Sequence, residues 1–273
     1  MKRIVIGVVP EAEKLTRLSA NPAAREGCRA QQFLDDHLCR AQPTAGTHLQ
    51  HAQHAVAFYN TAGFDHMRAF VTVLRTGRHI FPLATLTRGA VEAFAKANYL
   101  LGSTSAADLI LRYVGLACSE LRFSVRYSGF ALLDGTQVDG NAHLEELSGL
   151  PAQLGLGKAA QPSLTTLASD LLSEGAPGVS GREFYSQLSS VAHGETSGVT
   201  MFIDSDFEEG LRFFHRREVL VPYAGMLFAT CRTVMNKVVD HFGIEQDHRD
   251  RWRGVTERAE LWIEELRDSD PRL

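Results

Sequence analysis

Several features that would identify a protein of this size are scarce or missing from this 273-residue sequence. Proline, which breaks helices, occurs only nine times, and this favours long helices. No apolar run approaches the roughly 18 residues of a membrane span, so we expect a cytoplasmic protein without a membrane partner. The cysteines include no C-x-x-C pair, which excludes zinc-knuckle and thioredoxin-type motifs and predicts small buried hydrophobic side chains. They are Cys28, Cys39, Cys118 and Cys231.

A strong excess of charge of one sign is also missing. The 28 Lys and Arg residues are opposed by 32 Asp and Glu residues, for a net charge of -4. This balance argues against a surface that binds nucleic acid over its whole extent. Because 44% of the residues are hydrophobic, the chain has enough apolar side chains to fold.

Motifs for nucleotides and metals are absent from the sequence. There is no G-x-x-x-x-G-K-[ST] phosphate loop, no dinucleotide-binding G-x-G-x-x-G and no H-E-x-x-H. Among 11 histidines, His48, His51 and His54 are spaced by three residues, which spreads the outer two around a helix. We therefore predict no metal site and no cofactor.

Helical periodicity dominates what is present. Apolar residues recur every three to four positions, whereas the alternating pattern of strands is missing. The sequence predicts an all-α fold, a single multi-helix bundle with at most one short strand or extended arm, at residues 4–9. Glycine and proline breakers divide the rest into helices at 22–41, 46–60, 64–77, 79–101, 105–133, 140–149, 161–174, 181–193, 207–220, 222–242 and 247–268.

We expect one helical domain over residues 1–273. The stretch 135–180 is the least apolar and is rich in Gly, Pro and Ser. It is either a linker between two bundles or a loop-rich excursion within one, and the few long helices that follow it favour the excursion.

The predicted helix at 247–268 is amphipathic. Val255, Ala259, Trp262 and Leu266 lie on one apolar face. This face either packs on the core of its own chain or forms a homodimer or partner-subunit interface, where Trp is favoured.

The predicted helix at 79–101 is apolar around most of its circumference, which is typical of the centre of a bundle. Arg88, Glu92 and Lys96 nevertheless follow one another at four-residue steps along one face. This row is either an exposed face with ion pairs or the polar lining of a pocket inside the bundle, where ligand sites are common.

A second polar row follows the predicted helix at 105–133 and contains Arg112, Arg122 and Arg126. Arginine binds planar oxyanions through paired N–H groups. A solvated helix face also explains this row. Because two neighbouring helices share the arrangement, we predict an internal site for a small anion.

The segment 181–198 supplies candidates for proton transfer. Tyr185, Ser189 and His193 lie at four-residue steps, and His193 falls in the last helical turn before a glycine stop. The helix dipole there favours an imidazolium ion, and a histidine beside a phenol and a hydroxyl suits general acid–base chemistry. The alternative is a histidine that only caps the helix or satisfies the core.

Two segments resemble helical proteins of unknown function from actinobacteria. They are TRGAVEAFAKANYLL (87–101) and FYSQLSSVAHGE (184–195). Those proteins are similar in turn to the HEPN and abortive-infection superfamily of helical bundles. The resemblance implies an all-α bundle in which the Arg-x-x-x-Glu helix and the Tyr…Leu-Ser…His helix face each other. The Arg-x(4–6)-His motif of HEPN ribonucleases is not found, which weakens an RNA-cleaving activity.

Three functional hypotheses remain. The first is a cofactor-independent lyase or cyclase that acts on a small phosphate-, sulfate- or carboxylate-bearing molecule, as in bacterial specialised metabolism. The second is a HEPN-like defence or toxin protein that binds or cleaves RNA. The third is a non-catalytic subunit that binds a partner through its C-terminal helix. The first hypothesis assigns catalysis to His193, Glu92 and Tyr185, and substrate binding to Arg88, Arg112, Arg122 and Ser189.

Overall fold

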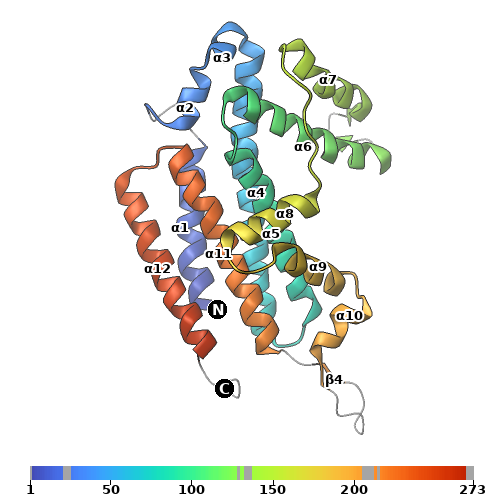
Figure 1. The fold of residues 1–273 in the computed structure, drawn as a ribbon, viewed down its shortest axis with the longest axis vertical. Helices are drawn as coiled ribbons and strands as arrows, with labels where there is room; N and C mark the ends of the chain where they lie inside the picture. The colour runs from blue at the N-terminus through green and yellow to red at the C-terminus, as the bar shows by residue number, and fades with distance from the viewer. Residues whose placement is uncertain are drawn as a thin grey trace.

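The computed structural model describes residues 2–20, 26–127, 130–131, 137–204, 212–213 and 216–268. As the sequence predicts, this part of the chain is all-α, and its helices pack as a bundle (Figure 1). The helices are α1 (Lys2–Ser19), α2 (Arg29–Leu34), α3 (His37–Ala41), α4 (Pro43–Thr76), α5 (Phe81–Leu101), α6 (Ala106–Tyr127), α7 (Gly140–Gln153), α8 (Leu164–Gly175), α9 (Gly181–Ala192), α10 (Thr196–Val199), α11 (Arg217–His241) and α12 (Gln246–Asp268), with a 3-10 turn at Thr200–Phe202.

Two small antiparallel hairpins accompany the helices. Strand β1 (Phe130–Ala131) pairs with β2 (Gln137–Val138), and Phe130 lies opposite Val138. Strand β3 (Ile203–Asp204) pairs with β4 (Arg212–Phe213), and Ile203 lies opposite Phe213. With two residues in each strand, these hairpins do not alter the fold class.

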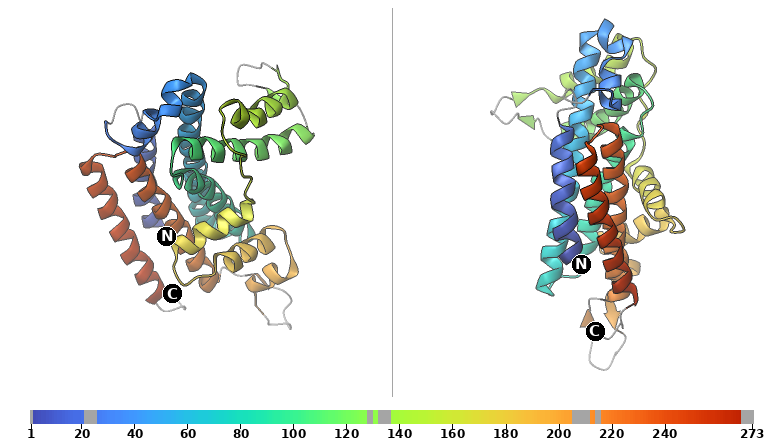
Figure 2. Two further views of the ribbon diagram at one scale, coloured as in Figure 1. Left: turned by 45° about the horizontal axis from the view of Figure 1, so that its top comes forward. Right: turned by 90° about the vertical axis from the view of Figure 1, so that its left-hand side faces the viewer.

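Helix α5 lies at the centre of the bundle. Its most extensive contact is with α4, and it also packs against α6, α8, α9 and α11. Helices α1 and α12 lie side by side along the long axis of the molecule (Figure 2), and α1 also contacts α4 and α11. Helix α7 packs on α6. The central position of α5 explains why it is apolar around most of its circumference.

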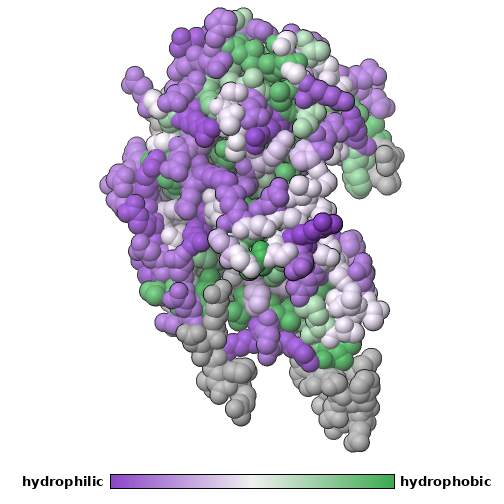
Figure 3. All heavy atoms as spheres, in the orientation of Figure 1, coloured by the Kyte–Doolittle hydropathy of each residue, from purple (hydrophilic) through white to green (hydrophobic). Residues whose placement is uncertain are grey.

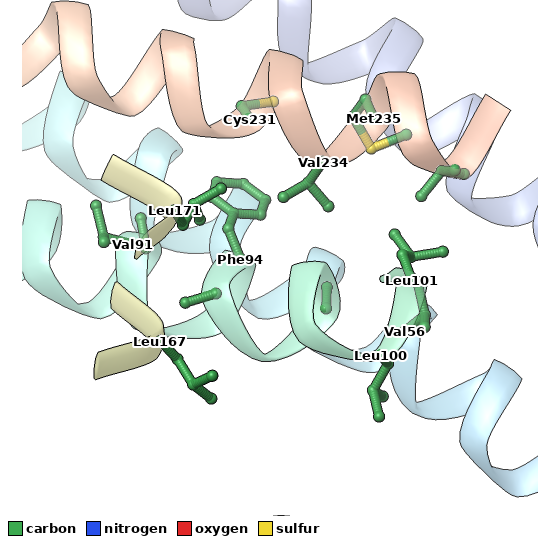
Figure 4. Packing of buried hydrophobic residues seen from close by; sticks show 14 of the residues in the cluster. Val56, Val91, Phe94, Leu100, Leu101, Leu167, Leu171, Cys231, Val234 and Met235 are labelled. Atoms are coloured by element: carbon green, nitrogen blue, oxygen red, sulfur yellow. The ribbon is translucent and has the colours of Figure 1, made fainter. Parts of the chain in front are cut away.

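One cluster of buried hydrophobic side chains runs through these helices, from Val5 in α1 to Ile263 in α12. Around the fully buried Phe94 of α5, side chains of α8 and α11 come together, among them Leu171 and Val234 (Figure 4). Burying a side chain of this size contributes about 1.5–3 kcal/mol to folding. The four cysteines are buried free thiols, as predicted.

Helix α4 runs through Gly63 as one helix, where we predicted two, at 46–60 and 64–77. Glycine in a helix costs about 1 kcal/mol relative to alanine. A Cβ atom at Gly63, however, would lie 2.5 Å from the ring of Phe94. The glycine is therefore present because α4 and α5 approach closely there, and it does not end the helix.

The strand or extended arm predicted at residues 4–9 is wrong, because these residues belong to helix α1. Val8, Val9, Ala12 and Leu15 are buried, and their spacing fits one helical face. Pro10 lies inside α1, where it removes one backbone donor. Packing against α4, α11 and α12 holds the helix together despite that loss.

The helix predicted at 22–41 is also wrong over its described residues, which form α2 and α3. The Sγ of Cys28 accepts a hydrogen bond from the Gln31 N–H at 3.3 Å. Asp36 Oδ1 accepts one from the Leu38 N–H at 2.9 Å. Each short helix thus has its own N-cap. Residues 21–25 lie outside the described part of the chain.

The helices predicted at 207–220 and 222–242 are replaced by α11, which begins at Arg217 and contains Pro222. Residues 212–213 form β4, and 205–211 lie outside the described part. Pro222 is in the second turn, and burial of the helix in the core keeps it continuous through the proline. The helix predicted at 105–133 ends at Tyr127 and is followed by β1.

Helix α12 matches the prediction at 247–268, and its apolar face packs on α1 and α11. Ala259 is fully buried, and Trp262 is partly buried against α1 near Gly7. In the stretch 135–180, α8 packs on α5, α9 and α11, so its side chains belong to the core. No helix in the described ranges is long and apolar enough to cross a membrane.

Candidate acid–base site

The packing of α9 on α5 brings together four of the predicted site residues. Arg88 and Glu92 are one turn apart on α5, Tyr185 lies on α9, and His193 is the C-cap of α9. Arg88 Nε donates a hydrogen bond to Glu92 Oε1 at 2.7 Å. The hydroxyl of Tyr185 donates to the same oxygen at 2.6 Å. Arg88 Nη1 lies 2.9 Å from His193 Nε2. These four residues form the acid–base cluster.

The end of α9 holds His193 in place. The N–H of His193 donates to the carbonyl of Ser189 at 2.9 Å, and Gly194 follows with a φ of 68°, the left-handed conformation that the predicted helix stop requires. At the other end, the hydroxyl of Ser180 accepts from the Glu183 N–H at 3.3 Å. The side chain of His193 is exposed, whereas Tyr185 is only 4% exposed.

The contact between Arg88 and His193 defines the protonation of the imidazole. A guanidinium group has only donors, so His193 Nε2 accepts this hydrogen bond. In this arrangement the proton of the neutral imidazole lies on Nδ1. A bound oxyanion that took up the Arg88 N–H would release the Nε2 lone pair.

Burial and hydrogen bonding shift two further groups of the cluster. Burial alone lowers the pKa of Arg88, but its hydrogen bonds with Glu92 and Tyr185 outweigh this effect and raise the pKa above the usual range. Burial, and then the hydrogen bond to Glu92, raise the pKa of Tyr185. Tyr185 thus remains a neutral donor to Glu92. The guanidinium also lies over the Tyr185 ring, 5.5 Å from its centroid.

Lys96, the third residue of the polar row on α5, belongs to a different contact. Its Nζ lies 2.7 Å from Glu120 Oε1 of α6 and 5.3 Å from the ring centroid of Tyr59 on α4. The hydroxyl of Tyr59 donates to the same Glu120 oxygen at 3.1 Å. The row therefore splits between two helix contacts and does not line one pocket.

Arg112 repeats the local environment of Arg88 without a histidine. Its Nε donates to Asp108 Oδ1 at 2.9 Å, its Nη1 donates to the Tyr99 carbonyl at 2.7 Å, and it lies 4.9 Å from the Tyr99 ring centroid. Burial raises the pKa of Asp108, but hydrogen bonds from Arg112 and Thr104 outweigh this and lower it. Tyr99 is three turns along α5 from Arg88, so Arg112 does not reach the acid–base cluster.

The other residues of the predicted anion site lie elsewhere or act through their backbone. Arg122 donates to Gln161 Oε1 in the loop before α8. A Cβ atom at Gly115 would overlap the carbonyl oxygen of Ala160, so this loop covers the face of α6 that carries the arginine row. The side chain of Arg126 lies outside the described part. Ser189 contributes its carbonyl to the hydrogen bond from His193. The prediction that Arg88, Arg112 and Arg122 share one site is therefore wrong.

Comparison with protein-family models, curated proteins and solved structures finds no match to this chain. The candidate site therefore rests on its geometry. Within the described ranges, no group of three or more His, Cys, Asp and Glu side chains is placed to hold a metal ion. His48 and His51 contact each other edge to face, with their ring centroids 5.6 Å apart.

A cavity of about 880 Å³, which no sequence pattern predicted, lies between the α8–α9 loop, α11 and α12. None of the four residues of the acid–base cluster lines it. Its walls come from three segments far apart in the sequence, so periodicity within one helix gave no sign of it. One local signal was Gly225, a glycine inside a helix.

Proposed function

We propose that the acid–base cluster is the catalytic centre of a metal-independent enzyme whose substrate carries an oxyanion such as phosphate, sulfate or carboxylate. The observation that carries this proposal is the contact of Arg88 with His193. It joins a permanent cation, which binds oxyanions, to an exposed base, which exchanges protons. A purely structural ion pair would need only Arg88 and Glu92.

Each residue has a distinct part in this proposal. Arg88 binds the oxyanion, since its five N–H donors exceed those used by its contacts within the protein. When Arg88 turns its Nη1 from His193 to the bound oxyanion, the Nε2 lone pair is released, and His193 accepts a proton there. Glu92 orients Arg88, and Tyr185 is a positioning residue that holds Glu92. This differs from our expectation that Glu92 and Tyr185 are themselves catalytic.

The reaction that fits these groups is elimination or intramolecular displacement. His193 takes a proton from a C–H or O–H group of the substrate, and the freed electron pair forms the new bond. The leaving oxyanion departs with the electrons of the broken bond and is stabilised by Arg88. The protonated His193 then returns its proton to the leaving group or to water. Such a reaction needs positioning and charge neutralisation but no redox step.

A second candidate is the cleavage of RNA, and the exposure of His193 favours it. A histidine at an open helix end is accessible to a phosphodiester within a polymer. In that reaction His193 would take the proton of the 2′-hydroxyl, whose oxygen attacks the phosphorus and displaces the 5′-oxygen. Arg88 would neutralise the phosphate charge, and the protonated His193 would return its proton to the departing 5′-oxygen. The net charge of -4 opposes wide contact with RNA, so the first candidate is preferred.

The proposed function is tested by following the His193 imidazole in an NMR titration with inorganic phosphate and with sulfate. We expect saturable shifts of the His193 ring signals that Arg88→Ala abolishes. Arg112→Ala is the matched control, because Arg112 has the same i,i+4 ion pair and aromatic contact without a histidine. The proposal would be contradicted if neither phosphate nor sulfate shifted the His193 ring signals. It would also be contradicted if Arg88→Ala and Arg112→Ala lost the shifts equally. Cleavage of a labelled RNA that disappears with His193→Ala would support the second candidate.

A further inference from the structure

The cavity between the α8–α9 loop, α11 and α12 has the size of a small-molecule site. Its volume of about 880 Å³ lies within the roughly 300–1,000 Å³ typical of such sites. On the face drawn in Figure 3, hydrophobic residues reach the surface between α12 and α9, in the region that α11 occupies in Figure 1.

Most of the cavity wall is apolar. Met226 and Phe228 of α11 and Ile263 of α12 contribute side chains that are otherwise buried, with exposures of 7%, 3% and 7%. Pro177 and Val179 of the α8–α9 loop form part of the rim, and Val179 is exposed. A cavity with these walls suits a ligand with an apolar body.

Gly225 leaves the cavity open in the middle of α11. A Cβ atom there would meet nothing within 4 Å, whereas one at Gly175 would lie 3.3 Å from the backbone of Ala229. Glycine destabilises a helix relative to alanine, and close packing does not require it at position 225. The open space beside this residue is part of the cavity, since Gly225 lines it.

The charged residues that line the cavity are three glutamates and two arginines. Glu218 and Glu264 line it with exposed carboxylates. Pro222 has no N–H, so the backbone carbonyl of Glu218, one turn earlier, lacks the donor that it would have in a regular helix. This carbonyl is a further acceptor. A ligand that complements these groups carries hydrogen-bond donors and positive charge.

The two arginines of the wall have partners within the protein. Arg232 forms an ion pair with Glu260 and lies 5.5 Å from the ring centroid of Phe228. Arg217 has an interaction of its own within the protein. Because Glu260 is paired with Arg232, the remaining carboxylates among the lining residues are Glu218 and Glu264.

We infer that this cavity binds a small molecule with an apolar body and a protonated amine. The apolar body lies against Met226, Phe228 and Ile263, and the amine lies between Glu218 and Glu264. This inference is independent of the acid–base cluster and of the proposed function.

The test compares three ligands of the same length by calorimetric titration of the full chain: 4-phenylbutylamine, 4-phenylbutanol and 4-phenylbutyrate. We expect the amine to bind about tenfold more tightly than the alcohol, and the carboxylate to bind most weakly. In Gly225→Leu the new side chain fills the cavity, so binding of the amine falls by at least about tenfold. Gly225→Ala is the matched control and keeps the binding, because one methyl group occupies little of the volume.

A second variant, Glu218→Gln with Glu264→Gln, separates charge from shape. Both residues are exposed, so this variant folds even if Gly225→Leu does not. We expect it to bind the amine and the alcohol with equal affinity and to bind the alcohol as the native protein does. Three outcomes would overturn the inference. The native chain could bind none of the three ligands, or it could bind the amine and the carboxylate equally. Alternatively, folded Gly225→Leu could bind the amine as tightly as the native chain does.

Discussion

Arg88 Nη1 and His193 Nε2 lie 2.9 Å apart although the two residues are separated by 105 positions in the sequence. Because arginine can only donate, the contact keeps the imidazole in the tautomer with its proton on Nδ1. We therefore expect Arg88→Ala to shift His193 toward the tautomer with its proton on Nε2. The ring nitrogen and carbon chemical shifts of labelled histidine measure this change. Arg112→Ala should leave His193 unchanged, and a native protein whose His193 already carries its proton on Nε2 would refute the assignment.

The hydrogen bond from Tyr185 to Glu92 predicts a loss of stability in Tyr185→Phe. Tyr185 is 4% exposed, so the change leaves a partly buried carboxylate with one donor fewer. We expect the free energy of unfolding to fall by about 1–2 kcal/mol, measured by urea denaturation. Tyr99→Phe is the matched control, because Tyr99 presents its ring face to Arg112, and it should change stability by less than about 0.5 kcal/mol. Equal losses in the two variants would show that the Tyr185 hydroxyl has no special role.

Two helical glycines predict opposite effects of the same substitution. Gly63→Ala places a methyl group 2.5 Å from the Phe94 ring, so we expect a loss of about 1–3 kcal/mol through overpacking. Gly225→Ala places it in open space and should gain up to about 1 kcal/mol from helix propensity. Thermal and urea unfolding of both variants measure these changes. A stabilised Gly63→Ala would mean that α4 and α5 do not approach as closely as described.

The buried His241 predicts a dependence of stability on pH. Burial, and then the charge of Arg29, lower its pKa to about 4, and its ring contacts Phe33 edge to face. The unfolded chain takes up this proton near pH 6.5 and the folded chain only near pH 4, so stability decreases as pH falls through that window. The contribution lost is about 3 kcal/mol.

Urea denaturation across this pH range tests the assignment to His241. His241→Leu should lose less stability than the native chain between pH 6.5 and 4. His54→Leu, at an exposed position on α4, should retain the native dependence. If both variants respond to acid as the native chain does, another group is responsible.

The candidate site was predicted from the sequence only in part. The four-residue steps placed Arg88 with Glu92, and Tyr185 with His193, on common helix faces, and the structure brings these pairs together. The similar polar row on α6 predicted that Arg112 and Arg122 join these residues, and this prediction is wrong. Asp108 and the Tyr99 carbonyl bind Arg112, and Gln161 binds Arg122, so neither guanidinium is directed toward α9. The spacing of residues within one helix does not determine which side chains of other helices they contact.

The helical class and the composition of each helix face follow from local physics, because the 3.6-residue period and the helix stop at Gly194 depend only on neighbours along the chain. Contacts between distant segments depend on how the helices pack. The ring of Phe94 against Gly63 sets the approach of α4 to α5, and the Ala160 carbonyl against Gly115 covers the arginine row of α6. Burial in the bundle also kept α1 and α11 helical through Pro10 and Pro222. Packing of α9 on α5 thus gives Arg88 a histidine partner, whereas Arg112, which has a similar ion pair and aromatic contact, contacts Asp108 and Tyr99.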